Sequence, residues 1–270
     1  MLRLIHNLSL PLQFLFTYTA QMRFIVVDTA DSRGSVALFE GNRPLNSEVH
    51  AAEEDYSSWL LPAVHRLLAP YGLSLSQLDG YAVCAGPGSF TGLRVGLTTV
   101  KAWCEIYSKP IVALSRLEAL LETGPGEAIA AEPFVATYFD GRRKQLFAAL
   151  YRQSEGRFSI SGEEAVTAAA DFIERVAAES AGLSVCWRTP DPELIQLQPA
   201  WGRLLERGHT IQIVEPPFAA RLGSLALRKF QNGDTTDSLS LDANYVRRSD
   251  AEVLWKGNAS PLEPQKVYGC

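Results

Sequence analysis

The sequence predicts an α/β protein of two lobes that are built on the same plan. Three patterns lead to this prediction. Two stretches each show a three-strand meander followed by alternating helices and strands, a glycine-rich turn joins a buried strand to a long helix, and Gly124-Pro125-Gly126 breaks the chain between the two stretches. A chain of 270 residues, 47% hydrophobic and 20% charged, is long and apolar enough to bury the cores of such lobes.

The first lobe is expected to span residues 22–124. Alternating or continuous apolar runs, typical of strands, occur at 23–28, 34–40, 43–49, 80–85 and 111–114. Apolar residues at helical spacing predict helices at 54–69, 90–107 and 115–122. Helices and strands therefore alternate once the opening meander is complete.

Residues 1–21 are expected to lie outside the fold. Arg3 precedes an apolar run, in the order of a signal peptide, but Tyr18 stands where a cut after Ala20 would require a small residue. Met22 comes directly before the first expected strand. We therefore interpret residues 1–21 as an extension or as a start assigned too far upstream. No other segment approaches transmembrane length, so no contact with a membrane is expected.

The second, smaller lobe is expected over residues 125–270, with a C-terminal tail. The second meander is predicted at 133–139, 145–151 and near 157–161. The alternating part follows as helix 168–180, strand 183–187, helix 192–207, strand 211–214 and helix 218–232.

The glycine-rich turn carries three glycines, Gly88, Gly92 and Gly96, at four-residue spacing. Free N–H groups at a helix start favour an anion, which makes a weak anion or nucleotide loop one interpretation, with Gly86, Gly88, Ser89 and Arg94 as its residues. The spacing matches neither the Walker loop nor the dinucleotide fingerprint. These three glycines, which we call the glycine row, could instead face another helix at an interface, or let their own helix pack closely on its sheet.

Charge and cysteine content restrict the partners and the compartment. A net charge of −5 argues against a protein that binds nucleic acid unaided. The tight basic clusters Arg142-Arg143-Lys144 and Arg247-Arg248 are interpreted as solvated turn residues. The four cysteines, Cys84, Cys104, Cys186 and Cys270, stand far apart with no Cys-x-x-Cys pair. This pattern excludes a zinc ribbon and favours a reducing, cytoplasmic location.

Four separate stretches resemble the TsaB family, the noncatalytic subunits of the bacterial machinery that makes threonylcarbamoyladenosine in tRNA. They are the opening strand pair from Phe24 to Leu38, the loop and helix from Gly86 to Lys101, the strand pair around Asp140-Gly141-Arg142-Arg143, and the stretch from Tyr245 to Glu252. Together they span most of the chain, although residues 161–237 carry little recognisable signal.

This resemblance implies a two-lobed actin-like fold of the sugar-kinase and Hsp70 type (ASKHA), with duplicated βββαβα lobes. It also implies a noncatalytic scaffold or dimerisation subunit that supports a TsaD-like transferase, joined by a TsaE-like ATPase. ATP and metal are then expected in those partners and not in this chain, and tRNA is expected to be reached only through the complex. A self-dimer in the absence of the partner stays open.

In the family, the two subunits pair through the long helices of their first lobes. Carried over by position, the partner contact is expected to use Tyr56, Trp59, Leu60 and Ala63 of one helix and Gly92, Leu93, Gly96, Leu97, Val100 and Lys101 of the other. The typical family member has a histidine where this chain has Tyr56 or its neighbour.

No catalytic residue and no metal ligand set is expected. Asp28 keeps the carboxylate of catalytically active actin-like proteins, but Ala30 replaces the glycine turn, so Asp28 either holds a divalent ion or, as we favour, caps the turn. TsaD relatives bind metal through a His-x-x-x-His pair, and the corresponding helix holds only His65. Two alternatives remain, an independent actin-fold ATPase or small-molecule kinase and a glycoprotease-like metalloprotein.

Overall fold

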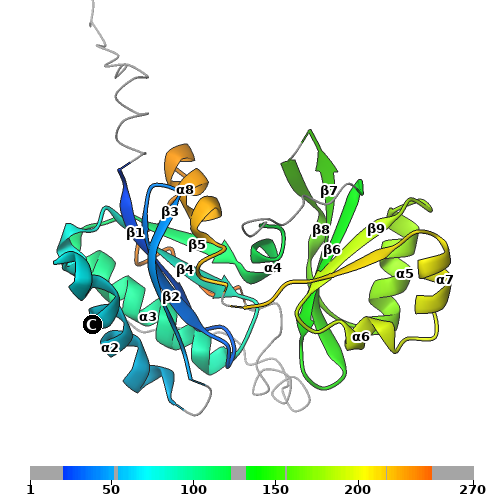
Figure 1. The fold of residues 1–270 in the computed structure, drawn as a ribbon, viewed down its shortest axis with the longest axis horizontal. Coiled ribbons are helices and arrows are strands. Elements are labelled where there is room, and N and C mark those ends of the chain that lie inside the picture. The colour runs from blue at the N-terminus through cyan, green and yellow to red at the C-terminus, as the bar shows by residue number, and fades with distance from the viewer. Residues whose placement is uncertain (1–20, 52–53, 123–131, 156, 217, 245–270) are drawn as a thin grey trace, which may run out of the picture.

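The computed structural model describes residues 21–51, 54–122, 132–155, 157–216 and 218–244. These residues form two lobes, each with a five-stranded mixed sheet and flanking helices (Figure 1). The two-lobed actin-like plan predicted from the sequence is confirmed. No helix within the described ranges has the length and apolar character needed to cross a membrane.

The first sheet has the order β3-β2-β1-β4-β5. Its strands are β1 (Arg23–Asp28), β2 (Ser35–Glu40), β3 (Arg43–Val49), β4 (Gly80–Gly86) and β5 (Ile111–Ser115). The first three pair antiparallel as a meander, whereas β4 runs parallel to β1 and β5 parallel to β4. Parallel neighbours need crossover connections, which the chain supplies as α2 (Tyr56–Leu68) with the 3-10 turns η1 (Ala69–Tyr71) and η2 (Leu75–Gln77), and as α3 (Phe90–Tyr107).

The second sheet repeats this topology in the order β8-β7-β6-β9-β10. Its strands are β6 (Phe134–Asp140), β7 (Gln145–Ser154), β8 (Arg157–Ala168), β9 (Val185–Thr189) and β10 (Thr210–Ile213), and α5 (Ala169–Glu179) forms its first crossover. The single helix predicted at 192–207 is wrong, because the structure has two short helices there, α6 (Glu193–Gln196) and α7 (Trp201–Glu206). Pro199 between them has no N–H and disfavours a helical residue before it.

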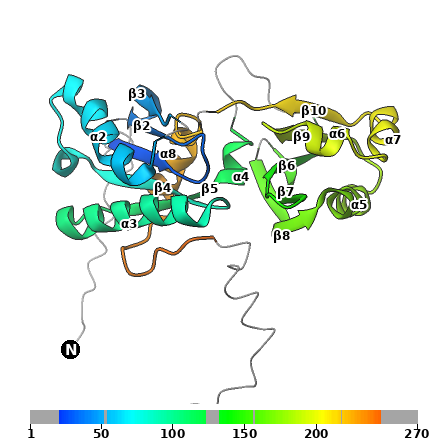
Figure 2. The same cartoon turned by 90° about the horizontal axis from the view of Figure 1, so that it is seen from below.

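After β10 the chain returns to the first lobe, which changes the predicted boundary of the second. The ring of Phe230 in α8 (Gly223–Asn232) lies 5.5 Å from the ring of Phe24, and Thr236 pairs with Ile111 at the sheet edge. Figure 2 shows α3 and α8 on opposite sides of the first sheet. The described residues from α8 onward therefore belong with the first lobe, and the second lobe does not extend over the whole of 125–270.

The cores explain this return. Alternate residues of β1 point to opposite faces, so Ile25 and Val27 pack under α2 and α3 while Phe24 and Val26 face α8 and the second lobe. The short helix α4 (Arg116–Ala119) lies between the two lobes (Figure 1). The core that contains Phe24 is continuous across both lobes, which fixes their relative position.

Candidate functional site at the junction of the lobes

The junction begins at the turn that follows β1. Asp28 ends this strand and is fully buried, and its Oδ1 accepts a hydrogen bond of 2.9 Å from the backbone N–H of Ala30. An aspartate that bonds the backbone two residues further on forms an Asx turn. The role as a turn cap, which the sequence favoured for Asp28, is therefore confirmed.

Arg116 is the cation that this turn faces. It is the first residue of α4, directly after β5, and its side chain is only 2% exposed. Its Nη2 lies 2.6 Å from Oδ2 of Asp31, and its Nε lies 3.6 Å from Oδ2 of Asp28. The guanidinium also lies over the ring of Phe139, 4.3 Å from its centroid. One buried arginine thus joins two carboxyl groups of the first lobe to an aromatic ring of the second.

The two carboxyl groups differ in acidity. Burial raises the pKa of Asp28, and the opposing attraction of Arg116 does not overcome it. Burial acts in the same direction on Asp31, but Arg116 and Arg33 together hold the pKa of Asp31 below its ordinary value. Asp31 is therefore the stronger acid of the two.

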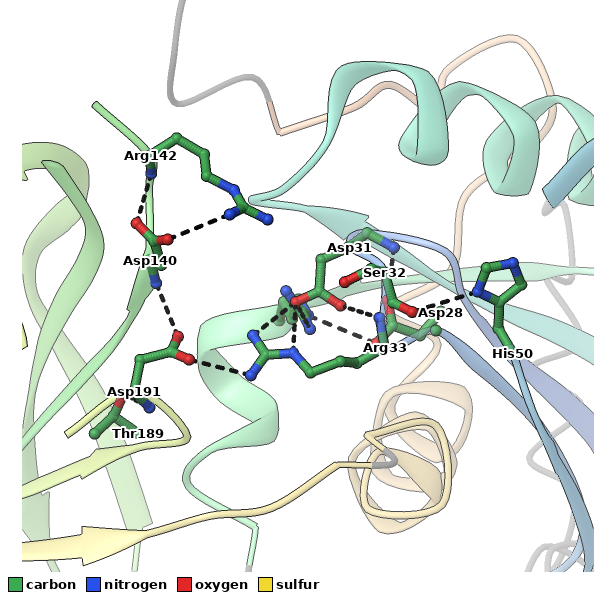
Figure 3. A network of polar contacts seen from close by, with 12 residues as sticks. Asp28, Asp31, Ser32, Arg33, His50, Asp140, Arg142, Thr189 and Asp191 are labelled. Carbon is green, nitrogen blue, oxygen red and sulfur yellow. Dashed lines mark hydrogen bonds and ion pairs between the residues drawn. The ribbon is translucent and has the colours of Figure 1, made fainter. Parts of the chain in front are cut away.

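Arg33 links the carboxyl groups of the first lobe to the second lobe. Its Nη2 lies 2.9 Å from Oδ2 of Asp31, and its Nη1 lies 3.1 Å from Oδ1 of Asp191. The other oxygen of Asp191 accepts a 3.0 Å hydrogen bond from the N–H of Asp140, and Thr189 orients Asp191 by accepting from its N–H. Figure 3 shows the resulting line of two ion pairs and one hydrogen bond, which crosses the junction from Asp31 to Asp140.

Tyr56 holds the same turn from the side of α2. Its hydroxyl accepts a 2.9 Å hydrogen bond from the N–H of Gly34 and donates to the carbonyl of Asp31. Its ring stacks on His50 with the centroids 4.0 Å apart, and burial raises the pKa of the Tyr56 phenol. Nδ1 of His50 lies 3.3 Å from the carbonyl oxygen of Ser32 (Figure 3). Tyr56 is thus a structural contact of the turn in this chain.

The glycine row packs against the first lobe's own backbone. A Cβ added at Gly88 would lie within 3.0 Å of the Ala30 carbonyl oxygen, and one added at Gly92 or Gly96 would lie within 3.0 Å of Thr29 atoms. Thr29 Oγ1 donates a 2.7 Å hydrogen bond to the carbonyl of Gly92. Of the three interpretations of the row, close packing of the helix on its own sheet describes this structure.

The predicted anion loop uses its polar groups within the chain. Ser89 caps α3, since its Oγ accepts from the N–H of Gly92 at 3.3 Å, and its own N–H donates to the carbonyl of Ala30 at 2.5 Å. The Arg94 guanidinium lies 3.7 Å from the centroid of the Phe90 ring. The two N–H groups and the cation that an anion would need therefore already have partners within the chain. Gly86 ends β4, and Gly88 packs against Ala30.

The residues predicted to contact a partner lie mainly inside the first lobe. Those that are buried in its core are Trp59, Leu60, Ala63, Gly92, Leu93, Gly96, Leu97 and Val100, whereas Tyr56 and Lys101 are half-buried. In the chain by itself these buried residues cover the first sheet, and their contact with a partner stays a prediction. The exposed side chains of the two helices include Leu61, His65 and Ile106.

Sequence reasoning did not single out Arg116, Arg33 or Asp191. The sequence did hold one signal for Arg116, which is its position directly after β5. Asp28 is the last residue of β1, and the carboxyl ends of parallel strands meet at one sheet edge, so the two side chains could be expected to lie close together. The described residues contain no group of three His, Cys, Asp or Glu side chains placed to hold a metal ion. The stretch from Tyr245 to Glu252, including Arg247-Arg248, and Cys270 lie outside the described residues.

The chain is similar to proteins of known families. A family model described as TsaD, tRNA N6-adenosine threonylcarbamoyltransferase, matches residues 49–192, which is more than half of the chain. A relative from Bacillus subtilis, named tRNA threonylcarbamoyladenosine biosynthesis protein TsaB, is 24% identical over 87% of this chain and 98% of its own length. Its namesake from Haemophilus influenzae is 28% identical over 87% of this chain and 96% of its own length.

Solved structures show the same likeness. The structure of YeaZ from Pseudomonas aeruginosa superimposes with a TM-score of 0.64 at 26% identity. The match covers 83% of this chain and 99% of that one, so both lobes take part.

Proposed function

The chain belongs to the TsaD family, and we propose that it acts in making N6-threonylcarbamoyladenosine in tRNA as a noncatalytic scaffold or dimerisation subunit. Its likeness to TsaB proteins over 87% of its length supports the pathway. The single observation that favours a noncatalytic role is the junction, where Arg33 pairs with both Asp31 and Asp191. A substrate phosphate or metal bound there would have to displace these ion pairs.

The proposed partner is a TsaD-like transferase, which a TsaE-like ATPase joins. We place the contact on the outer face of the two long helices, where Leu61 is 56% exposed and Ile106 is 68% exposed. Exposed apolar side chains of this kind supply contact area at protein interfaces. ATP and metal belong to the partners in this proposal, and tRNA is bound within the complex. The described cysteines Cys84, Cys104 and Cys186 are free thiols, which favours a reducing compartment such as the cytoplasm.

We expect depletion of the protein to abolish or strongly reduce N6-threonylcarbamoyladenosine, because the transferase loses its supporting subunit. Mass spectrometry of nucleosides from total tRNA measures this directly. The protein is also expected to copurify with a TsaD-like transferase from native extract. An unchanged level of the modified nucleoside in depleted cells would overturn the proposed function.

We expect the purified chain alone to hydrolyse ATP no faster than buffer. The reason is that Arg33 and Arg116 are already paired with carboxylates at the junction. A phosphate-release assay measures the rate, and the Asp191→Asn variant serves as a control that loosens the junction. Turnover by the wild-type chain that Asp191→Asn abolishes would favour the independent ATPase instead.

A further inference from the structure

Arg142, Arg143 and Lys144 form the only run of three consecutive basic residues in the sequence. The structure places them in the turn between β6 and β7, where all three are exposed. We call this segment, residues 142–144, the basic turn. Figure 3 shows the Arg142 side chain beside the junction, where its Nη1 lies 3.6 Å from Oδ2 of Asp140.

The backbone of the basic turn has an unusual conformation. Its φ angles are 62° at Arg142, 52° at Arg143 and 61° at Lys144, all in the left-handed region. Glycine and asparagine adopt this region readily, whereas long side chains do so rarely and at a cost in stability. Strained backbone of this kind gathers at functional sites, and here it presents three cations where the conformation alone favours glycine or asparagine.

The basic turn is also held firmly in place. The N–H of Arg142 donates to Oδ1 of Asp140 at 2.8 Å, the N–H of Gln145 donates to the carbonyl of Arg142 at 2.9 Å, and the N–H of Gly141 donates to the carbonyl of Gln145 at 2.8 Å. Asp140 itself donates its N–H to Asp191, which pairs with Arg33 of the first lobe. The turn is therefore anchored to the same network that joins the two lobes.

We infer that the basic turn contacts the phosphate backbone of tRNA while the tRNA is held in the complex with the transferase. This inference rests on the proposed function, which makes tRNA the substrate of the complex. Guanidinium and ammonium groups neutralise phosphates, and arginine does so with a planar fork that matches two phosphate oxygens. The chain carries a net charge of −5, so its attraction for RNA has to come from a local cluster such as this one.

The test measures tRNA binding by the reconstituted complex, with an unmodified tRNA transcript as the probe. A double variant, Arg143→Gln with Lys144→Gln, removes two cations of the turn. We expect its affinity for tRNA to fall, and the slope of log affinity against log salt concentration to decrease in magnitude by about 2, since each phosphate contact contributes about 0.9 on a duplex. Fluorescence anisotropy at several salt concentrations gives the slope.

Two further variants separate RNA contact from other roles. Arg203→Gln with Arg207→Gln removes the same charge from exposed positions in and directly after α7, and should leave the slope unchanged. Arg143→Asn removes one cation but suits the left-handed backbone. It should therefore keep or raise the melting temperature of the chain while still weakening tRNA binding.

Three outcomes would overturn the inference while leaving the proposed function intact. One is an unchanged salt slope in the double variant whose complex still forms. Another is an equal loss of slope in the α7 control, which would mean that only net charge matters. The third is weakened transferase binding by a variant whose complex, once assembled at higher protein concentration, has unchanged tRNA affinity. That result would assign the turn to an acidic protein surface.

Discussion

Replacing Arg116 with methionine is expected to lower the free energy of unfolding by about 3–5 kcal/mol at pH 7, the usual cost of breaking a buried ion pair from one side. Methionine fills much of the same space but carries no charge. Asp28, which is fully buried, and Asp31 then lose the cation whose Nε and Nη2 lie 3.6 Å and 2.6 Å from their oxygens. Urea denaturation followed by circular dichroism measures the change.

The free energy of unfolding that Arg116→Met loses should become smaller as the pH falls from 7 toward 4. Burial already raises the pKa of Asp28 in the folded chain above its ordinary value of 3.8. The stability that protonated Asp28 provides is therefore fully present below pH 3.8, and it is lost as the pH rises through the pKa of the folded chain. Without Arg116 that folded pKa rises further, which removes more stability at neutral pH than in acid. The lowered pKa of Asp31 acts in the same sense, because the stability it provides is present above 3.8 and depends on Arg116.

The matched control is Arg43→Met. Arg43 also pairs with a carboxylate, Glu40, at 2.8 Å, but its side chain is 70% exposed. Surface ion pairs contribute little, so we expect a change within about 0.5 kcal/mol at either pH. If Arg116→Met lowers the free energy of unfolding by the same amount at pH 7 and pH 4, lost packing, and not loss of the paired charges, accounts for the effect.

Much of the fold could be predicted from the sequence because its signals are local. The period-2 and continuous apolar runs of β1 to β5 identify strands wherever those strands later pair. The destination of α8 is a different matter. Helical spacing shows that α8 has an apolar face but not which sheet it covers. That choice depends on Phe24, which β1 places on the side of the sheet that faces α8.

The same distinction applies to the junction. The cap of Asp28 was predictable because its partner lies two residues away, at Ala30. The pair of Arg33 and Asp191 joins residues that are 158 positions apart, and no local pattern marks either one. The glycine spacing correctly indicated close approach of a backbone, but the approaching atoms at Thr29 and Ala30 come from a distant turn.

Replacing Gly92 with alanine is expected to destabilise the first lobe, although alanine is the better helix former. The added Cβ would lie within 3.0 Å of the Thr29 carbonyl oxygen, a backbone atom that cannot rotate away. Overpacking of this kind costs on the order of 3 kcal/mol, which exceeds the roughly 1 kcal/mol that alanine gains over glycine within a helix. The net loss of about 2 kcal/mol should lower the melting temperature by roughly 4–8 °C.

The matched control is the same substitution at Gly202 in α7, where a Cβ would meet nothing within 4 Å. Gly202→Ala should raise stability by up to about 1 kcal/mol, because only the loss of backbone freedom in the unfolded chain remains. Opposite signs for one chemical change would show that contact with Thr29 decides the role of the glycine row. If Gly92→Ala instead melts at or above the wild-type temperature, α3 can move off its sheet, and the row regains its interpretation as a surface for another helix.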